Sequence, residues 1–143
     1  MPGSVHAAIA GMDNQPKPYD IKERLFEFAC DVINAYPRHS KLDLASIRVW
    51  GQVLSSSTSS GAHLEEAQAG GSDAHFISLT RGGLREIRES QYWLRVMVAT
   101  KLANYQSVGP LVQESKELTA ILTTIVKKSV KKAEEKQKKR IPK

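Results

Sequence analysis

Residues 72–98 read SDAHFISLTRGGLREIRESQYWLRVMV and decide the fold class of this 143-residue chain. Ser72 followed by Asp73 is a strong helix start, because a serine side chain caps the first N–H groups and an acidic residue is stabilised beside them. Beyond it, one side of the segment repeats at steps of three and four. The residues of this seam are Ile77, Thr80, Leu84, Ile87, Gln91, Leu94 and Val98. This alternation is typical of a helix packed in a bundle and predicts a helix from about Asp73 to Ala103.

Two helices are predicted before this segment. The first helix is predicted to begin after Asp20, which is a candidate N-cap with Glu23 at the capping-box spacing. Pro37 is predicted to end this helix at about Tyr36. A second helix begins near Asp43, and Gly70–Gly71 ends it. The residues predicted to form its core seam are Leu44, Ile47, Gly51, Leu54, Thr58 and Gly61.

The stretch 55–62 has the composition of a linker, because it contains only Ser, Thr, Gly and Ala. Composition therefore predicts a break in the second helix. The periodicity favours an unbroken helix, because Leu64 and Ala67 continue in phase and no proline intervenes. The residues alone leave both possibilities open.

A fourth helix follows a connector at 104–109, with Pro110 predicted at its first helical position. Its seam residues are Leu111, Ser115, Leu118, Leu122, Ile125 and Ser129. Four long helices with short connectors predict an all-α, antiparallel, up-down-up-down four-helix bundle. We divide the chain into a flexible leader (1–18), the bundle (19–133) and a basic C-terminal tail (134–143).

Composition and charge exclude several classes of protein. The chain has 21 Lys and Arg against 15 Asp and Glu, and residues 127–143 hold nine of these bases and two of the acids. The single cysteine, Cys30, excludes an internal disulfide, and we interpret it as a packing residue. No apolar run approaches the roughly 20 residues that a membrane-spanning helix needs. We therefore expect a cytoplasmic protein without membrane association.

The second and third helices resemble a bacterial family of four-helix-bundle proteins, named after members encoded in intervening sequences of 23S ribosomal RNA genes. The matching residues are Gln52 to His63, Glu66–Ala67, Ser72, His75–Phe76–Ile77, Leu84, Glu86, Glu89, Tyr92, Trp93 and Leu94. The sequence departs from the family pattern at Ser55, Ser60, His63 and His75, where the family usually has Arg, Ile, Asn and Asp.

The resemblance implies three further properties. In that family the segment matching residues 55–62 lies inside the second helix. The bundles of the family assemble as homopentamers. Relatives include the accessory protein of diversity-generating retroelements, which binds a reverse transcriptase and nucleic acid. The resemblance thus implies the chain itself, nucleic acid and a reverse transcriptase as partners.

Two basic sets are candidates for nucleic-acid binding. On the third helix, at about 100° per residue, one stripe borders the core seam and is therefore expected to be exposed. Its residues are Arg81, Arg85, Arg88, Tyr92 and Arg95. Arginine suits phosphate and a tyrosine can stack on a base. A solvated face paired with helix acids is the alternative.

The second set belongs to the end of the fourth helix and the tail. Its residues are Lys127, Lys128, Lys131, Lys132, Lys136, Lys138, Lys139 and Arg140. Phosphate binding is one interpretation of this set. The other is a solvated, fraying helix end, where lysines are favoured by the helix dipole.

Another face of the third helix predicts an oligomer interface. Its residues are Glu86, Glu89, Trp93 and Met97. Trp93 and Met97 lie off the core seam, and large apolar side chains exposed there would be costly. The alternative is that Trp93 packs into its own bundle.

Catalytic and metal sites are not predicted. A metal-binding bundle needs Glu-x-x-His pairs on two helices, and the nearest spacings, at Glu86–Glu89 and His63–Glu66, do not fit. We therefore expect a non-enzymatic, homo-oligomeric scaffold that binds RNA or RNA/DNA without a cofactor, with an accessory role for a reverse transcriptase implied by the resemblance. The alternative function is a structural protein–protein interaction module with no role for nucleic acid.

Overall fold

Four helices make up the described part of the chain, residues 20–142 of a computed structural model. They are α2 (Ile21–Ala35), α3 (Leu44–Gln68), α4 (Asp73–Ala99) and α5 (Tyr105–Arg140). Within this range there is no strand, which confirms the all-α, four-helix prediction. The predicted leader, 1–18, lies outside the described residues.

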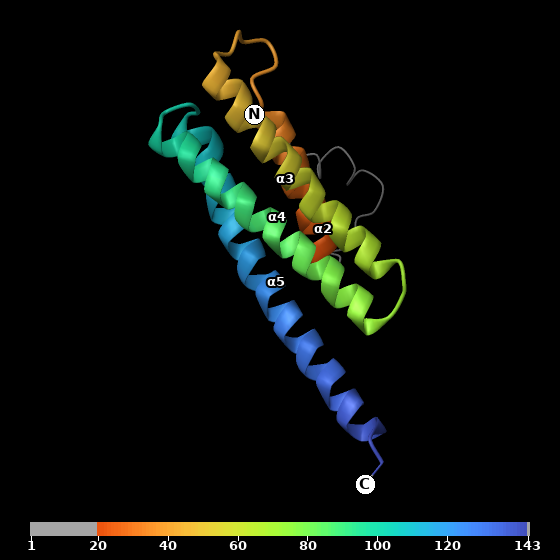
Figure 1. The fold of residues 1–143 in the computed structure, drawn as a ribbon. Helices are drawn as coiled ribbons and strands as arrows, with labels where there is room; N and C mark the ends of the chain where they lie inside the picture. Colours follow the sequence, from red (N-terminus) through yellow and green to blue (C-terminus); the bar gives the residue numbers. More distant parts are fainter. Residues whose placement is uncertain (1–19, 143) are drawn as a thin grey trace, which may run out of the picture.

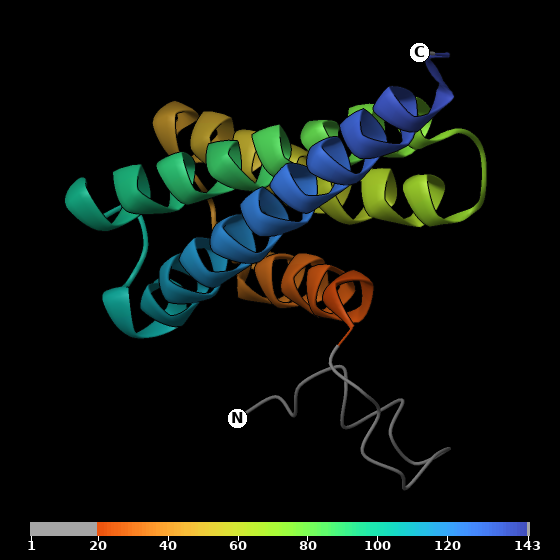
Figure 2. The ribbon, with the colours of Figure 1, turned by 90° about the horizontal axis from the view of Figure 1, so that it is seen from below.

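Each helix packs against the helices next to it around the bundle: α2 against α3, α3 against α4, α4 against α5, and α5 against α2. Helices α2 and α4 therefore lie diagonally opposite each other. The longest helix, α5, crosses the bundle obliquely, and its C-terminal end extends beyond the other helices (Figures 1 and 2).

The helices begin at side-chain caps that satisfy the first N–H groups. Asp20 accepts a hydrogen bond from the Lys22 N–H, and Ser72 accepts one from His75. Both caps are as predicted. Asp43 caps α3 in the same way through the Ser46 N–H.

The predicted start of α5 is wrong. The helix begins at Tyr105 after the cap Asn104, so Pro110 lies inside it. A proline interior to a helix loses one hydrogen bond and crowds the preceding turn. The first turn is retained here because Val108 and Gly109 are buried against the rest of the bundle.

The predicted end of α4, at Ala103, is also wrong. Helix α4 ends at Ala99, where both the N–H and the hydroxyl of Thr100 donate to the Val96 carbonyl. Lys101 then adopts φ of 59°, a left-handed conformation usually taken by glycine. The sequence holds no glycine there to indicate the stop.

The predicted core seam of α3 is largely wrong. Leu44 and Ile47 are 70% and 53% exposed, and Gly51 and Thr58 are also exposed. Leu54 is half-buried, and Gly61 is buried as expected. The buried face is a different heptad row on the same helix: Trp50, Val53, Ser57, Ser60, Leu64 and Ala67. Small polar residues form part of this row, so apolar spacing alone selected the wrong side.

The serine-rich stretch is helical throughout, as periodicity and the family resemblance predict. Its buried hydroxyls find local partners, such as Ser60 donating to the Ser57 carbonyl at 2.9 Å. Between helices, the hydroxyl oxygens of Ser56 and Ser90 lie 2.8 Å apart. Small residues thus bring α3 and α4 close together without leaving these buried hydroxyls unpaired.

Candidate nucleic-acid interface

The arginine stripe lies on the outer surface of α4. Arg81, Arg85, Arg88 and Arg95 are exposed, which confirms the predicted exposure, and Tyr92 is 55% exposed. The Tyr92 ring packs edge-to-face on Trp93, with ring centroids 5.0 Å apart. Within residues 20–142 none of these arginines has a carboxylate at ion-pair distance. The alternative of a face paired with helix acids is therefore not what the described residues form.

Three of these arginines border a groove of about 660 Å³ between α4 and the C-terminal half of α5. Five of the apolar residues that line it are buried or half-buried, and therefore form its floor: Ile77, Leu84, Val126, Val130 and Ala133. The exposed side chains stand at its rim, with Arg81, Arg85 and Arg88 on α4 and Glu134 and Gln137 on α5. Arg95 and Tyr92 do not line the groove. Sequence patterns could not show it, because it depends on how α5 crosses α4.

The basic residues of α5 form a second surface. The helix continues without a break to Arg140, and all eight predicted side chains, from Lys127 to Arg140, are exposed. The Lys136 ammonium lies 3.0 Å from an Asp73 carboxylate oxygen at the start of α4. A hydrogen bond from Lys136, and the charges of Lys136, Lys132 and Arg140, lower the pKa of Asp73. This contact joins the basic end of α5 to α4.

The four residues of the predicted oligomer interface differ in burial. Met97 is fully buried within its own bundle, so its assignment to an oligomer interface is wrong. The predicted seam residues of α4 are buried or half-buried as expected, but the buried face is wider than that seam and also includes Ser90 and Met97. Trp93 is half-buried and donates from its indole N–H to Glu89 at 3.3 Å. Glu86 is half-buried and Glu89 is exposed; with Trp93 they stay a predicted interface.

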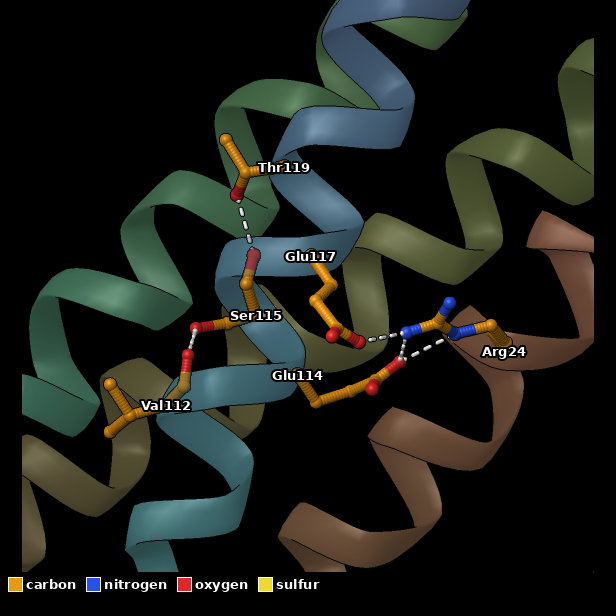
Figure 3. Close-up of polar contacts among 6 residues, drawn as sticks. All are labelled: Arg24, Val112, Glu114, Ser115, Glu117 and Thr119. Atoms are coloured by element: carbon orange, nitrogen blue, oxygen red, sulfur yellow. Dashed lines mark hydrogen bonds and ion pairs between the residues drawn. The ribbon is translucent and has the colours of Figure 1, made fainter.

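Helix α2 is joined to α5 by an ion-pair cluster that sequence patterns did not indicate. The Arg24 guanidinium donates to Glu114 at 2.7 Å and to Glu117 at 2.8 Å (Figure 3). Two turns of α5 thus hold a single arginine of α2. The neighbouring Ser115 and Thr119 hydroxyls donate to carbonyls of their own helix.

Cys30 is the one free cysteine of the described residues. Burial, and then the charges of Asp31, Glu23 and Glu27, raise the pKa of the Cys30 thiol, which disfavours a reactive thiolate. Residues 20–142 hold no group of three side chains able to bind a metal ion. The same residues include no helix long and apolar enough to cross a membrane.

Comparison with solved structures gives a similarity that bears on the fold. The chain resembles a protein of unknown function from the S23 ribosomal protein family of Bacteroides thetaiotaomicron VPI-5482. Identity is 29%, the TM-score is 0.68, and the match covers 76% of this chain and 99% of the other. It supports the four-helix, all-α part of the resemblance. The relation to retroelement accessory proteins stays a prediction.

Sequence comparisons were otherwise negative. No protein-family model matches the chain, and no curated protein matches it. Function must therefore be argued from the surfaces of the molecule.

Two of the four departures from the family pattern lie at the α3–α4 contact. His63 donates from Nδ1 to the Ser59 carbonyl at 2.7 Å, and its ring lies against Gly82. Ser60 is fully buried and packs where Gly83 approaches α3. These positions therefore contribute to helix packing in this chain.

Proposed function

We propose that this protein is a non-enzymatic, homo-oligomeric scaffold that binds nucleic acid through the basic end of α5. The observation that carries the proposal is the row of exposed cations on the C-terminal part of α5, the helix whose end extends beyond the other helices (Figure 1). A helix rises about 1.5 Å per residue, so residues 127–140 span about 20 Å. This length matches several consecutive phosphates of a nucleic-acid backbone.

Lysine is suited to contacts that do not depend on base sequence. Its ammonium is a compact charge on a flexible stem, so it can reach a phosphate without a fixed geometry. Each phosphate that a lysine neutralises releases its bound counterions, which favours binding at low salt. Arg95 and Tyr92 extend the basic surface of α4 and offer a ring that can stack on a base. The proposal is therefore binding by backbone charge, with a strong dependence on salt.

The resemblance supports finer parts of the proposal. These are antiparallel bundles, assembly as a homopentamer, a cytoplasmic location, and service as an accessory to a reverse transcriptase. A homo-oligomer would repeat the basic surface in every subunit and raise the affinity for a long nucleic acid by multivalency.

The test is a titration of a fluorescently labelled RNA hairpin with the full-length chain, followed by anisotropy from about 50 to about 200 mM salt. The triple variant K127E/K131E/K138E removes three cations that make no ion pair within the described residues. We expect binding at low salt, and a log–log salt slope that is smaller by about 2–3 in the variant.

The matched control is K41E/K101E/K116E, which makes the same change in net charge at exposed lysines elsewhere. It should retain most of the affinity. If the wild-type chain binds no RNA at low salt, or if both triple variants weaken binding equally, the proposal is wrong. The protein–protein interaction module is then the better account.

A further inference from the structure

The floor of the groove between α4 and α5 continues the buried row of α5. Leu118, Leu122 and Val126 are buried in the bundle at steps of four residues. The row continues through Val130 and Ala133, which are half-buried and line the groove. All residues that line the groove belong to α4 and α5, so neither α2 nor α3 covers it. The floor is therefore the accessible end of a helix-packing seam.

Helix α4 faces this floor with a similar spacing. Among the residues of α4 that line the groove, one row alternates in steps of three and four: Ala74, Ile77, Arg81, Leu84 and Arg88. Such rows on two neighbouring helices form holes into which the side chains of a third helix can pack as knobs. None of the described residues that line the groove is aromatic, so it offers no stacking platform for bases. The spacing and the aliphatic floor favour a helix as the occupant.

The charges beside the groove favour an acidic occupant. The three arginines of the α4 rim have no carboxylate at ion-pair distance within residues 20–142. The α5 rim has one acid, Glu134, but Lys131 and Lys138 lie one helical turn before and after it. Two copies of the chain that met through this groove would bring like charges together, which is costly. A segment that carries acidic residues beside an apolar row fits both the floor and the rims.

The length of the groove sets the length of the segment. At about 1.5 Å per residue, the α4 row from Ala74 to Arg88 spans about 21 Å, and the α5 row from Val126 to Gln137 spans about 16 Å. A helix of about 11–15 residues would therefore cover the floor from end to end.

We propose that the α4–α5 groove binds an acidic amphipathic helix of a partner protein. The helix buries its apolar row on the floor, and its carboxylates pair with Arg81, Arg85 and Arg88. The lysines of α5 that lie outside the groove stay available for phosphate, so the stripe predicted as one nucleic-acid site with them takes a separate role. The inference goes beyond the proposed function and does not depend on nucleic-acid binding by α5.

The test is a titration of a fluorescently labelled synthetic peptide of about 18 residues with the full-length chain, followed by anisotropy. The peptide carries leucine at the a and d positions of its heptads and glutamate at the e and g positions. We expect it to bind the wild-type chain, and R85E/R88E to weaken binding at least about tenfold, because like charges then face each other. A peptide of the same composition with its leucines spread around the helix should also bind at least about tenfold more weakly, because it has no apolar row for the floor.

Two controls separate the groove from net charge. The variant K41E/R95E makes the same change in net charge as R85E/R88E at exposed residues outside the groove, and should bind the acidic peptide as the wild-type chain does. A peptide with lysine in place of each glutamate should bind R85E/R88E more tightly than it binds the wild-type chain.

Three results overturn the inference, each with circular dichroism showing intact helices. If the acidic peptide does not bind the wild-type chain, or binds R85E/R88E equally well, the groove is not a site for an acidic helix. If R85E/R88E lowers the sedimentation mass of the protein alone and K41E/R95E does not, a second copy occupies the groove. If R85E/R88E loses affinity for the RNA hairpin and keeps affinity for the peptide, the arginines bind nucleic acid. RNA binding by the α5 lysines is decided separately by K127E/K131E/K138E.

Discussion

Two glycine-to-alanine substitutions test the packing of α3 on α4. Gly51 and Gly83 both lie inside helices, where alanine is preferred over glycine by about 0.8–1.0 kcal/mol. Their surroundings differ. A Cβ at Gly51 would meet nothing within 4 Å, whereas a Cβ at Gly83 would collide with the buried Leu64 side chain and lie 3.2 Å from the Ser60 carbonyl oxygen.

The expected effects therefore have opposite signs. Gly51→Ala gains the full helical preference and should raise the free energy of unfolding by about 0.5–1 kcal/mol. Gly83→Ala gains the same preference but overpacks the core, which typically costs about 1–3 kcal/mol. We expect a net loss of about 1–2 kcal/mol, because Leu64 is enclosed and the Ser60 carbonyl is backbone.

The assay is urea unfolding followed by circular dichroism, with the two variants and the wild-type chain at equal concentration. A change in midpoint at constant slope reports stability alone. If Gly83→Ala is as stable as Gly51→Ala, the two helices do not approach as closely as the structure indicates, and the account of the serine-rich stretch fails.

Three further predictions concern contacts between helices. Ser56→Ala should lower the free energy of unfolding by about 1–2 kcal/mol, because it leaves the buried Ser90 hydroxyl without its partner across the helices. In a double-mutant cycle measured by urea unfolding, the variant that combines Ser56→Ala with Ser90→Ala should lose less free energy of unfolding than the two single variants together. Arg24→Met should lower the free energy of unfolding by about 1 kcal/mol and raise amide exchange in α2, because two carboxylates of α5 lose their partner while the side-chain volume is kept. Unchanged amide exchange in α2 would refute the claim that Arg24 joins α2 to α5. The pKa of Asp73 is lowered in the folded chain by Lys136, so the stability that this ion pair contributes is complete above the unfolded pKa, near 3.9, and is lost as pH falls through the lower folded value. The thermal midpoint of Asp73→Asn should therefore fall less than that of the wild-type chain between about pH 5 and about pH 2. An equal fall in both chains would contradict the contact.

The sequence predicts the existence of the four helices well, and the buried face of each helix less well. Caps such as Asp20 and Ser72 are local signals, and they begin the helices where expected. The buried side of α3 was missed because its row contains Ser57 and Ser60. Serine is buried there through hydrogen bonds to its own helix, so a search for apolar side chains selects the Leu44 side instead.

The candidate surfaces could also be predicted only in part. Exposure of the arginine stripe follows from helical periodicity and is confirmed, and the α5 lysines are exposed as well. The groove beside Arg85 depends on the oblique path of α5, which no local pattern encodes. The prediction for Met97 fails because the buried face of α4 is wider than its apolar seam and extends over Ser90 and Met97.

The most direct test of the central claim is sedimentation velocity of the full-length chain with a labelled RNA hairpin, at low and then at high salt. The account predicts a protein multimer that carries the RNA at low salt, and that releases it at high salt because phosphate contacts exchange with counterions. A monomer, or a multimer that sediments without the RNA at low salt, would contradict it.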